Sequence, residues 1–130
     1  MLLANSACYY ATGPINDSGL FVPIGVVLNG TDADDTVGQV NGTFNGGSGN
    51  DTANGEVGGT FNGGPGNDSV NVSVYNGIFN GGPGADCADR IDSESYYGTF
   101  NGGAGADWYN LNYNGIVWSA DQDDKACPQP

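Results

Sequence analysis

Copies of one glycine-rich hexapeptide constrain the fold of this chain more than any other feature of its sequence. Four clear copies read GGSGND, GGPGND, GGPGAD and GGAGAD, and two weaker ones, GTDADD and SADQDD, flank them. The copies start at positions 30, 46, 63, 81, 102 and 119, so the steps are 16, 17, 18, 21 and 17 residues. A nearly fixed period of this length is typical of a solenoid, in which each unit buries its apolar face only against the next unit.

Each step is long enough for two short strands and two turns. The sequence therefore predicts an all-β fold, a parallel β-roll or β-solenoid of about five coils with the glycine loops along one edge. We assign the coils to residues 28–126, an N-terminal cap to residues 1–27 and a short tail to residues 127–130. A solenoid needs a cap because its first coil has no neighbour. A frayed tail is the alternative for residues 1–27.

Glycine makes up 24 of the 130 residues, which raises two other possibilities. Collagen is excluded because glycine does not occupy every third position. Disorder is the stronger alternative for a glycine-rich, highly charged chain. Seven Tyr, five Phe and two Trp argue against disorder, because most of them fall at fixed phases of the repeat.

Alternation with a period of two predicts which side chains face the core. After each loop the inward position holds Val37, Ala53, Val70, Ala88, Tyr109 and Ala126. In the second strand the expected inward columns are Val40, Val57, Tyr75, Tyr96 and Tyr113, then five glycines from Gly42 to Gly115, then Phe44, Phe61, Phe79, Phe100 and Val117. The expected outward residues include Cys87, Trp108, and an asparagine ladder at Asn45, Asn62, Asn80 and Asn101. Extra residues from Arg90 to Ser95 are expected to bulge from the turn opposite the loops.

The charge balance points to cations as partners. Fifteen acidic residues face only Arg90 and Lys125, for a formal net charge of −13. Such a chain repels nucleic acids and anionic membranes. No apolar run approaches the roughly 20 residues that span a bilayer, so membrane insertion is not expected. The start Met1-Leu2-Leu3 lacks the basic residues of a secretory signal, so any export is expected to use a signal elsewhere.

The three cysteines and the absence of histidine make a zinc site unfavourable. A disulfide between Cys8 and Cys127 would require the two ends of the stack to fold back. Without histidine, no acid–base or nucleophilic constellation stands out, and we expect a protein that is not an enzyme.

The loops offer what a hard divalent cation prefers. Glycines let several carbonyl oxygens turn toward one point, and the closing aspartate adds a carboxylate. Calcium takes six to eight oxygen ligands, so two stacked loops can share an ion that one loop cannot hold. Six loops would hold up to about five Ca²⁺ ions. Without them, a column of aspartates would repel itself, so we expect folding to depend on calcium. Magnesium should compete poorly because it demands tight octahedral geometry.

The segments GGSGNDTAN, GGPGNDSVN, GGPGADCAD and GGAGADWYN resemble the calcium-binding nonapeptide GGxGxDxUx of the repeats-in-toxin (RTX) family. This resemblance implies a calcium-stabilised β-roll in a secreted or cell-surface bacterial protein. It also implies that the ligands are loop carbonyls and aspartate carboxylates. The expected carboxylates are Asp35, Asp51, Asp68, Asp86, Asp107 and Asp124, and the expected loop residues are Gly46, Ser48, Gly49, Gly63, Pro65, Gly66, Gly81, Pro83, Gly84, Gly102, Ala104 and Gly105. RTX rolls bind calcium along both edges, whereas here only one edge has the loop, so we expect a single column of ions.

The leading expectation is a non-catalytic, calcium-stabilised structural module. An adhesin or glycan-binding module is an alternative that could use Trp108, Trp118 or Tyr97. An ice-binding protein is a further alternative, since Thr43, Thr60 and Thr99 fall in line, although isoleucines interrupt the row. The chain is expected to be a monomer or to associate end to end.

Overall fold

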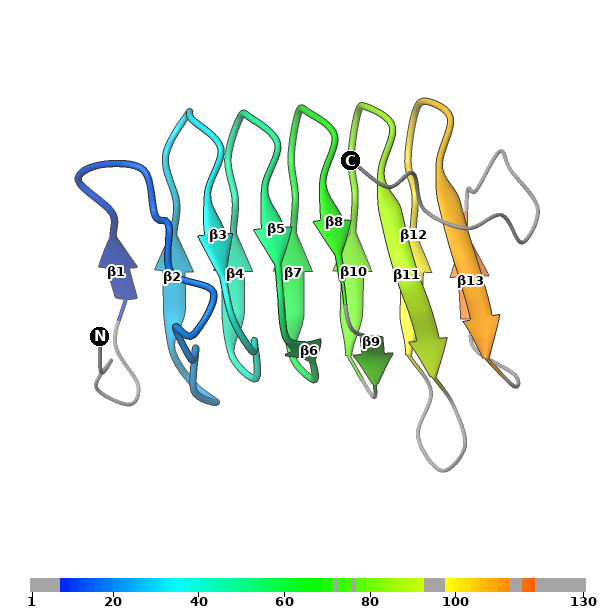
Figure 1. Ribbon diagram of the computed structural model, residues 1–130, viewed down its shortest axis with the longest axis horizontal. Coiled ribbons are helices and arrows are strands. Elements are labelled where there is room, and N and C mark those ends of the chain that lie inside the picture. The colour runs from blue at the N-terminus through cyan, green and yellow to red at the C-terminus, as the bar shows by residue number, and fades with distance from the viewer. Residues whose placement is uncertain (1–7, 72, 76, 93–97, 113–115, 119–130) are drawn as a thin grey trace.

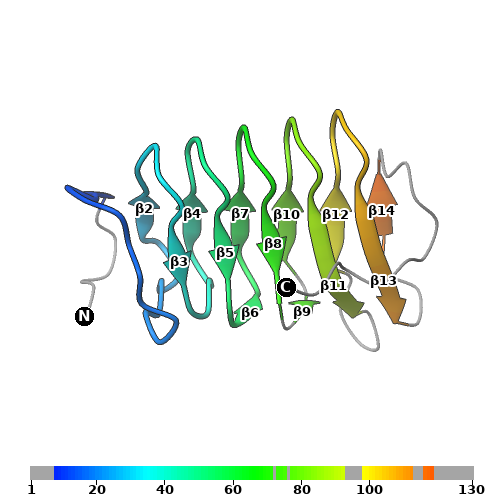
Figure 2. The same ribbon diagram turned by 45° about the horizontal axis from the view of Figure 1, so that its top comes forward.

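The structure, a computed structural model, describes residues 8–71, 73–75, 77–92, 98–112 and 116–118. Within these residues it is all-β, and parallel strands stack side by side along one axis (Figure 1). In each coil the chain forms a strand of one sheet, passes through a glycine loop, forms a strand of the other sheet and returns through a turn. This is the predicted β-solenoid, with its glycine loops gathered along one edge, at the top of Figures 1 and 2.

Two sheets form the walls of the solenoid. The first has the order β1-β2-β4-β7-β10-β12-β14, with bounds Cys8–Tyr10, Val27–Asn29, Thr43–Asn45, Thr60–Asn62, Ile78–Asn80, Thr99–Asn101 and Ile116–Trp118. The second has the order β3-β5-β8-β11-β9-β6, with bounds Thr36–Val37, Thr52–Ala53, Ser69–Val70, Cys87–Asp92, Ser73–Tyr75 and Glu56–Val57. Strand β13, Trp108–Asn112, pairs with β11 outside this order.

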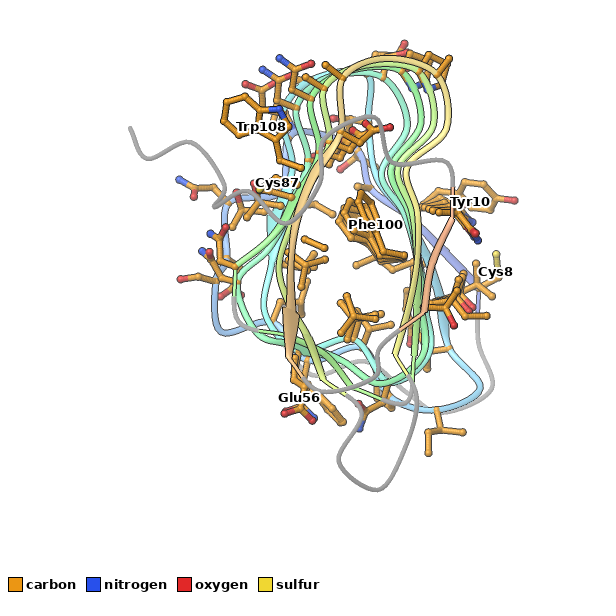
Figure 3. All side chains as sticks on the ribbon, turned by 90° about the vertical axis from the view of Figure 1, so that its right-hand side faces the viewer. Cys8, Tyr10, Glu56, Cys87, Phe100 and Trp108 are labelled. Atoms are coloured by element: carbon orange, nitrogen blue, oxygen red, sulfur yellow. The ribbon has the colours of Figure 1, made fainter. Side chains whose placement is uncertain are left out.

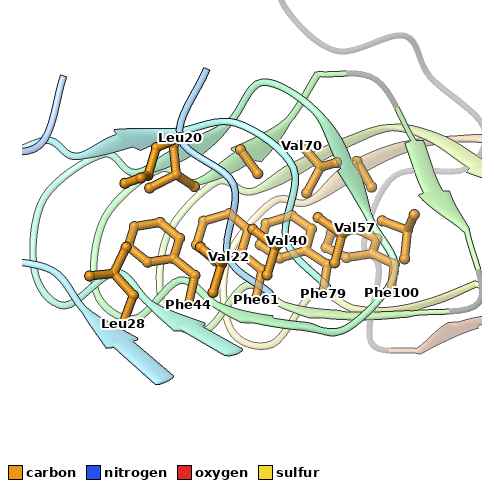
Figure 4. Packing of buried hydrophobic residues seen from close by; sticks show 14 of the residues in the cluster. Leu20, Val22, Leu28, Val40, Phe44, Val57, Phe61, Val70, Phe79 and Phe100 are labelled. Atoms are coloured by element: carbon orange, nitrogen blue, oxygen red, sulfur yellow. The ribbon is translucent and has the colours of Figure 1, made fainter. Parts of the chain in front are cut away.

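A column of phenylalanines runs through the interior, as the repeat predicts. The register pairs Phe44 with Phe61, Phe61 with Phe79, and Phe79 with Phe100. All four side chains are fully buried, and successive rings are stacked with centroids 4.9–5.1 Å apart (Figure 4). The opposite sheet supplies Val37, Ala53, Val70 and Ala88, which are also fully buried, so the predicted alternation is confirmed here.

The predicted tyrosine column is wrong. Strand β9 places Val74, not Tyr75, beside Val57, and Ile91 pairs with Val74 in turn. The 18-residue repeat therefore holds its extra residue between Val74 and β10, so counting four residues back from Phe79 misplaces the column by one. The predictions for Tyr96 and Tyr113 lie outside the described residues.

In the fourth repeat one expectation is corrected and another is confirmed. Arg90 belongs to strand β11, which continues to Asp92, so this part of the predicted bulge is strand with a register shift. Cys87 is 7% exposed, although the alternation predicts that it faces outward. It does lie on the outer face, between Ser69 and Trp108 in the register, but it is disulfide-bonded and lies beside the large Trp108 (Figure 3). Cys8 is a free, exposed thiol, so it does not pair with Cys127.

Residues 8–27 wind as a coil of their own. Strand β1 pairs with β2, Asn16 bridges to Thr36, and Val22 bridges to Val40. The side chains of Leu20, Val22 and Val26 are at most 1% exposed and join the common core. The described part of this segment is therefore packed, and the frayed-tail alternative is wrong for it.

Candidate metal centre

A column of buried carboxylates lies beneath the glycine loops. Each loop ends in an aspartate, and the strand that follows it enters the second sheet. The side chains are buried and at most 1% exposed; they are Asp35, Asp51, Asp68, Asp86 and Asp107. The structure therefore brings five of the six predicted carboxylates into one column, and Asp124 lies outside the described residues.

Backbone hydrogen bonds fix one oxygen of each carboxylate. The N–H of Asp35 donates to Asp51 Oδ1 at 2.8 Å, and the N–H of Asp51 donates to Asp68 Oδ1 at 2.8 Å. The same bond joins Asp68 to Asp86 at 2.9 Å and Asp86 to Asp107 at 3.0 Å. Hydrogen bonds to a charged acceptor are strong, so this ladder ties each coil to the next through the side chain of its aspartate.

The second oxygen is left without a hydrogen bond in three successive coils. Oδ2 of Asp51, Asp68 and Asp86 is buried and makes none. Each lies against the Cα of the first glycine of its own loop, where any Cβ would collide with the carboxylate. An ionised oxygen buried without a partner is costly, so each of these three sites calls for a proton or a cation.

The pKa values of the same carboxylates express this cost. Burial, together with neighbouring aspartates, raises the pKa of Asp51 to about 8 and that of Asp86 to about 7, against the lowering effect of the ladder hydrogen bond. Burial raises the pKa of Asp68 to about 6. Desolvation disfavours the charged form, which is why all three shifts have the same direction. The whole chain has only Arg90 and Lys125 as basic residues to offset such charge.

The loop backbone departs from the expected ligand arrangement. Loop carbonyls accept hydrogen bonds from the loop of the preceding coil: Pro65 O from Gly49, Pro83 O from Gly66, and Ala104 O from Gly84, at 2.9–3.0 Å. Gly81 O and Gly102 O accept in the same way, at 3.0–3.1 Å. Carbonyls that were expected to converge on ions thus already connect neighbouring loops. Each carbonyl has a second lone pair, so it can still bind a cation, whereas Oδ2 of Asp51, Asp68 and Asp86 accepts no hydrogen bond.

The glycines at the second and fourth positions of the four clear loops make this close stacking possible. Gly66 has φ +130°, and a Cβ there would collide with the carbonyl oxygen of Gly49. Gly84 has φ +134° and meets Gly66 in the same way. The repeated glycines are therefore explained by positive φ and by contact between loops, whether or not an ion is bound.

The first loop differs from the others. Asp35 Oδ2 accepts from the N–H of Thr31 at 2.6 Å, and the Thr31 hydroxyl lies 3.1 Å from both carboxylate oxygens. Ile15 N–H donates to Asp35 Oδ1 at 2.7 Å. Sequence reasoning grouped Asp35 with the other carboxylates. The threonine at a position that holds glycine in the four clear copies was the signal that could have separated it.

Two asparagine ladders run alongside the carboxylates. The predicted one joins Asn45, Asn62, Asn80 and Asn101 through side-chain amide bonds of 2.6–2.8 Å, and a bond of 3.0 Å extends it to Asn29, which was not predicted. A second ladder, on the exposed side of the loops, was not predicted. The side-chain oxygen of Asp34 accepts from Asn50 N–H, that of Asn50 from Asn67 N–H, and that of Asn67 from Ala85 N–H, at 2.8–2.9 Å. Both ladders hold the coils at a constant spacing, which keeps the buried carboxylates aligned.

The donor set is chemically suited to a hard cation. It offers buried carboxylate oxygens with carbonyl oxygens close by, and no nitrogen or sulfur ligand. Among the residues that the structure describes, no three His, Cys, Asp or Glu side chains converge on one point, so an ion would need backbone or water oxygens as well.

Within the same residues no helix is long and apolar enough to cross a membrane.

Comparisons with known proteins identify no relative. No protein-family model matches the sequence, and no curated protein or solved structure matches it. The function must therefore be argued from the column of carboxylates.

Proposed function

We propose that this chain is a non-catalytic, calcium-binding structural module of a secreted or cell-surface bacterial protein, whose coils are joined along one edge by Ca²⁺. The observation that carries the proposal is the row of buried, unpartnered Oδ2 atoms on Asp51, Asp68 and Asp86. The proposed secretion and bacterial source rest on the resemblance of the loops to RTX repeats.

The roles of the residues follow from their positions. The carboxylates of Asp51, Asp68 and Asp86 would supply charged ligands, and the loop carbonyls would complete the oxygen shell. Bound calcium would supply positive charge that the chain itself lacks. The backbone N–H ladder would orient each carboxylate by holding its Oδ1, which leaves Oδ2 for the ion.

Calcium is favoured over other cations because it accepts many oxygen ligands in an adaptable geometry. The loops are rich in glycine and supply backbone carbonyl oxygens. Such oxygens can adapt to the irregular shell of six to eight oxygens around Ca²⁺. Magnesium needs near-ideal octahedral geometry and loses its waters reluctantly, so it suits such a site poorly. Binding would then contribute directly to the free energy of folding.

Isothermal titration calorimetry and equilibrium dialysis with Ca²⁺ test the proposal. The wild type should bind several ions per chain, and Asp68→Asn should bind fewer with lower affinity. Asp32→Asn is the matched control, because Asp32 is exposed at a loop tip and its loss changes the net charge by the same amount. Equal calcium binding by all three proteins, or none by the wild type, would refute the proposal.

A calcium-dependent adhesin or glycan-binding module is the second candidate. The outer face of the second sheet carries Trp108 beside Cys87, where a hollow of about 90 Å³ opens. A glycan array with and without calcium separates this candidate from a purely structural module. For ice binding the register does align Thr43, Thr60 and Thr99, but Ile78, 40% exposed, interrupts the row, and an ice-recrystallisation assay decides it.

A further inference from the structure

Thr31 occupies a loop position that glycine fills in the four clear copies. The first loop reads Gly30-Thr31-Asp32-Ala33-Asp34-Asp35, and the equivalent second positions are Gly47, Gly64, Gly82 and Gly103. In the later loops the N–H of this residue can bond to the next coil: Gly64 donates to Gly81 O at 3.0 Å and Gly82 to Gly102 O at 3.1 Å. In the first loop the N–H of Thr31 turns instead to Asp35, inside its own loop.

The contacts of Asp35 replace those that an ion would make. Thr31 gives this carboxylate a backbone N–H at 2.6 Å and a hydroxyl 3.1 Å from both oxygens, and Ile15 gives it a second N–H at 2.7 Å. The hydroxyl also accepts from Ala33 N–H at 3.2 Å, which steadies the loop. Asp51 and Asp68, by contrast, each have one ladder bond on Oδ1 and none on Oδ2.

The coil beneath this loop has an apolar core and a backbone network of its own. Leu20, Val22 and Val26 are at most 1% exposed. Thr36 N–H donates to Ile15 O at 2.7 Å, and Gly38 N–H donates to Leu20 O at 2.8 Å. These contacts involve no unpartnered carboxylate.

From this contrast we propose that Thr31 takes the place of a cation in the first loop. The N-terminal coil then folds without calcium, the calcium sites begin at Asp51, and the preformed coil offers the next strands an edge on which to add. This inference rests on the proposed calcium function, because it divides the acidic column into one loop that is closed by protein donors and later loops that need ions.

Hydrogen exchange followed by mass spectrometry tests this division at pH 7.5, in chelator and in calcium. In chelator, the amides of Thr36 and Gly38 should exchange at least about tenfold more slowly than those of Ser69 and Cys87, because local opening follows local stability. Thr31→Ser keeps the hydroxyl and should preserve this protection. Thr31→Ala and Thr31→Ser both lack the γ-methyl group and differ only in the hydroxyl, so Thr31→Ala alone should bring the N-terminal amides to within about threefold of the others.

Equilibrium dialysis supplies a second, independent measurement. Thr31→Gly gives the first loop the glycine of its neighbours, and it should bind one more Ca²⁺ per chain than the wild type. The inference is overturned if Thr31→Ala leaves the protection of Thr36 and Gly38 unchanged, or if Thr31→Gly binds no additional ion. Failure of the proposed function is recognised separately, by a wild-type protein that binds no calcium in the same dialysis.

Discussion

Asp51→Asn should change the stability of this protein in opposite directions with and without calcium. Burial raises the pKa of Asp51 from 3.8 to about 8, so at pH 7.5 the metal-free fold must take up a proton that the unfolded chain does not bind, and this proton uptake costs stability. A shift of about four pKa units corresponds to an upper limit of roughly 5 kcal/mol. The asparagine amide would itself be a buried donor without a partner, at a cost of about 1–3 kcal/mol. The expected net gain in chelator is therefore on the order of 2 kcal/mol in the free energy of unfolding.

In calcium the same substitution removes a charged ligand and should destabilise the protein. Each tenfold loss of calcium affinity corresponds to about 1.4 kcal/mol. Urea unfolding followed by circular dichroism at pH 7.5 measures the change in the free energy of unfolding, once in chelator and once in calcium on the order of 1 mM. At pH 5 the gain in chelator should largely disappear, because the pH is then close to the unfolded-state pKa of 3.8 and folding needs little extra proton uptake. Asp32→Asn should change stability by less than about 0.5 kcal/mol in each solution. A change of the same sign in both solutions at pH 7.5 would refute the reasoning.

Three further predictions concern the core, the loops and pH. Phe61→Ala removes a fully buried ring that stacks on two others, so it should cost about 3–5 kcal/mol in urea unfolding, whereas the same change at Phe21, 42% exposed, should cost far less. Gly66→Ala places a Cβ on a neighbouring carbonyl at φ +130° and should lower the free energy of unfolding by at least about 1–3 kcal/mol. Gly13→Ala, with open space around it, should be nearly neutral. Similar effects at both sites would contradict the stacked-loop geometry. In chelator, carboxyls with raised folded-state pKa values make the fold most stable below about pH 4 and progressively less stable as pH rises through 6 to 8. The melting temperature should therefore fall over that range. A rise in melting temperature would contradict the pKa shifts.

The repeat allowed the main columns to be predicted because stacked coils place equivalent residues on one another. Phe44, Phe61 and Phe79 each lie two residues before the first glycine of a loop, which is enough to predict a core column, and the same argument aligns the aspartates. The tyrosine column failed because one inserted residue reverses the faces of a strand, and the sequence does not tell on which side of Val74 the insertion lies.

The inner details of the candidate site depend on hydrogen-bond choices that a repeat pattern does not encode. Nothing in the hexapeptide predicts that each aspartate N–H donates to the carboxylate of the next coil, or that loop carbonyls accept hydrogen bonds from neighbouring loops. The coil formed by residues 8–27 carries no repeat at all. It was recognised only through its pairing with β2 and its buried residues, such as Leu20.

A calcium titration followed by far-ultraviolet circular dichroism, with magnesium as the control, tests the central claim most directly. At pH 7.5 the strand signal should be incomplete in chelator, should rise to a plateau as calcium is added, and should respond little to the same concentrations of magnesium. A strand signal that is already complete in chelator, and that calcium leaves unchanged, would contradict the claim that cations between buried aspartates hold these coils together.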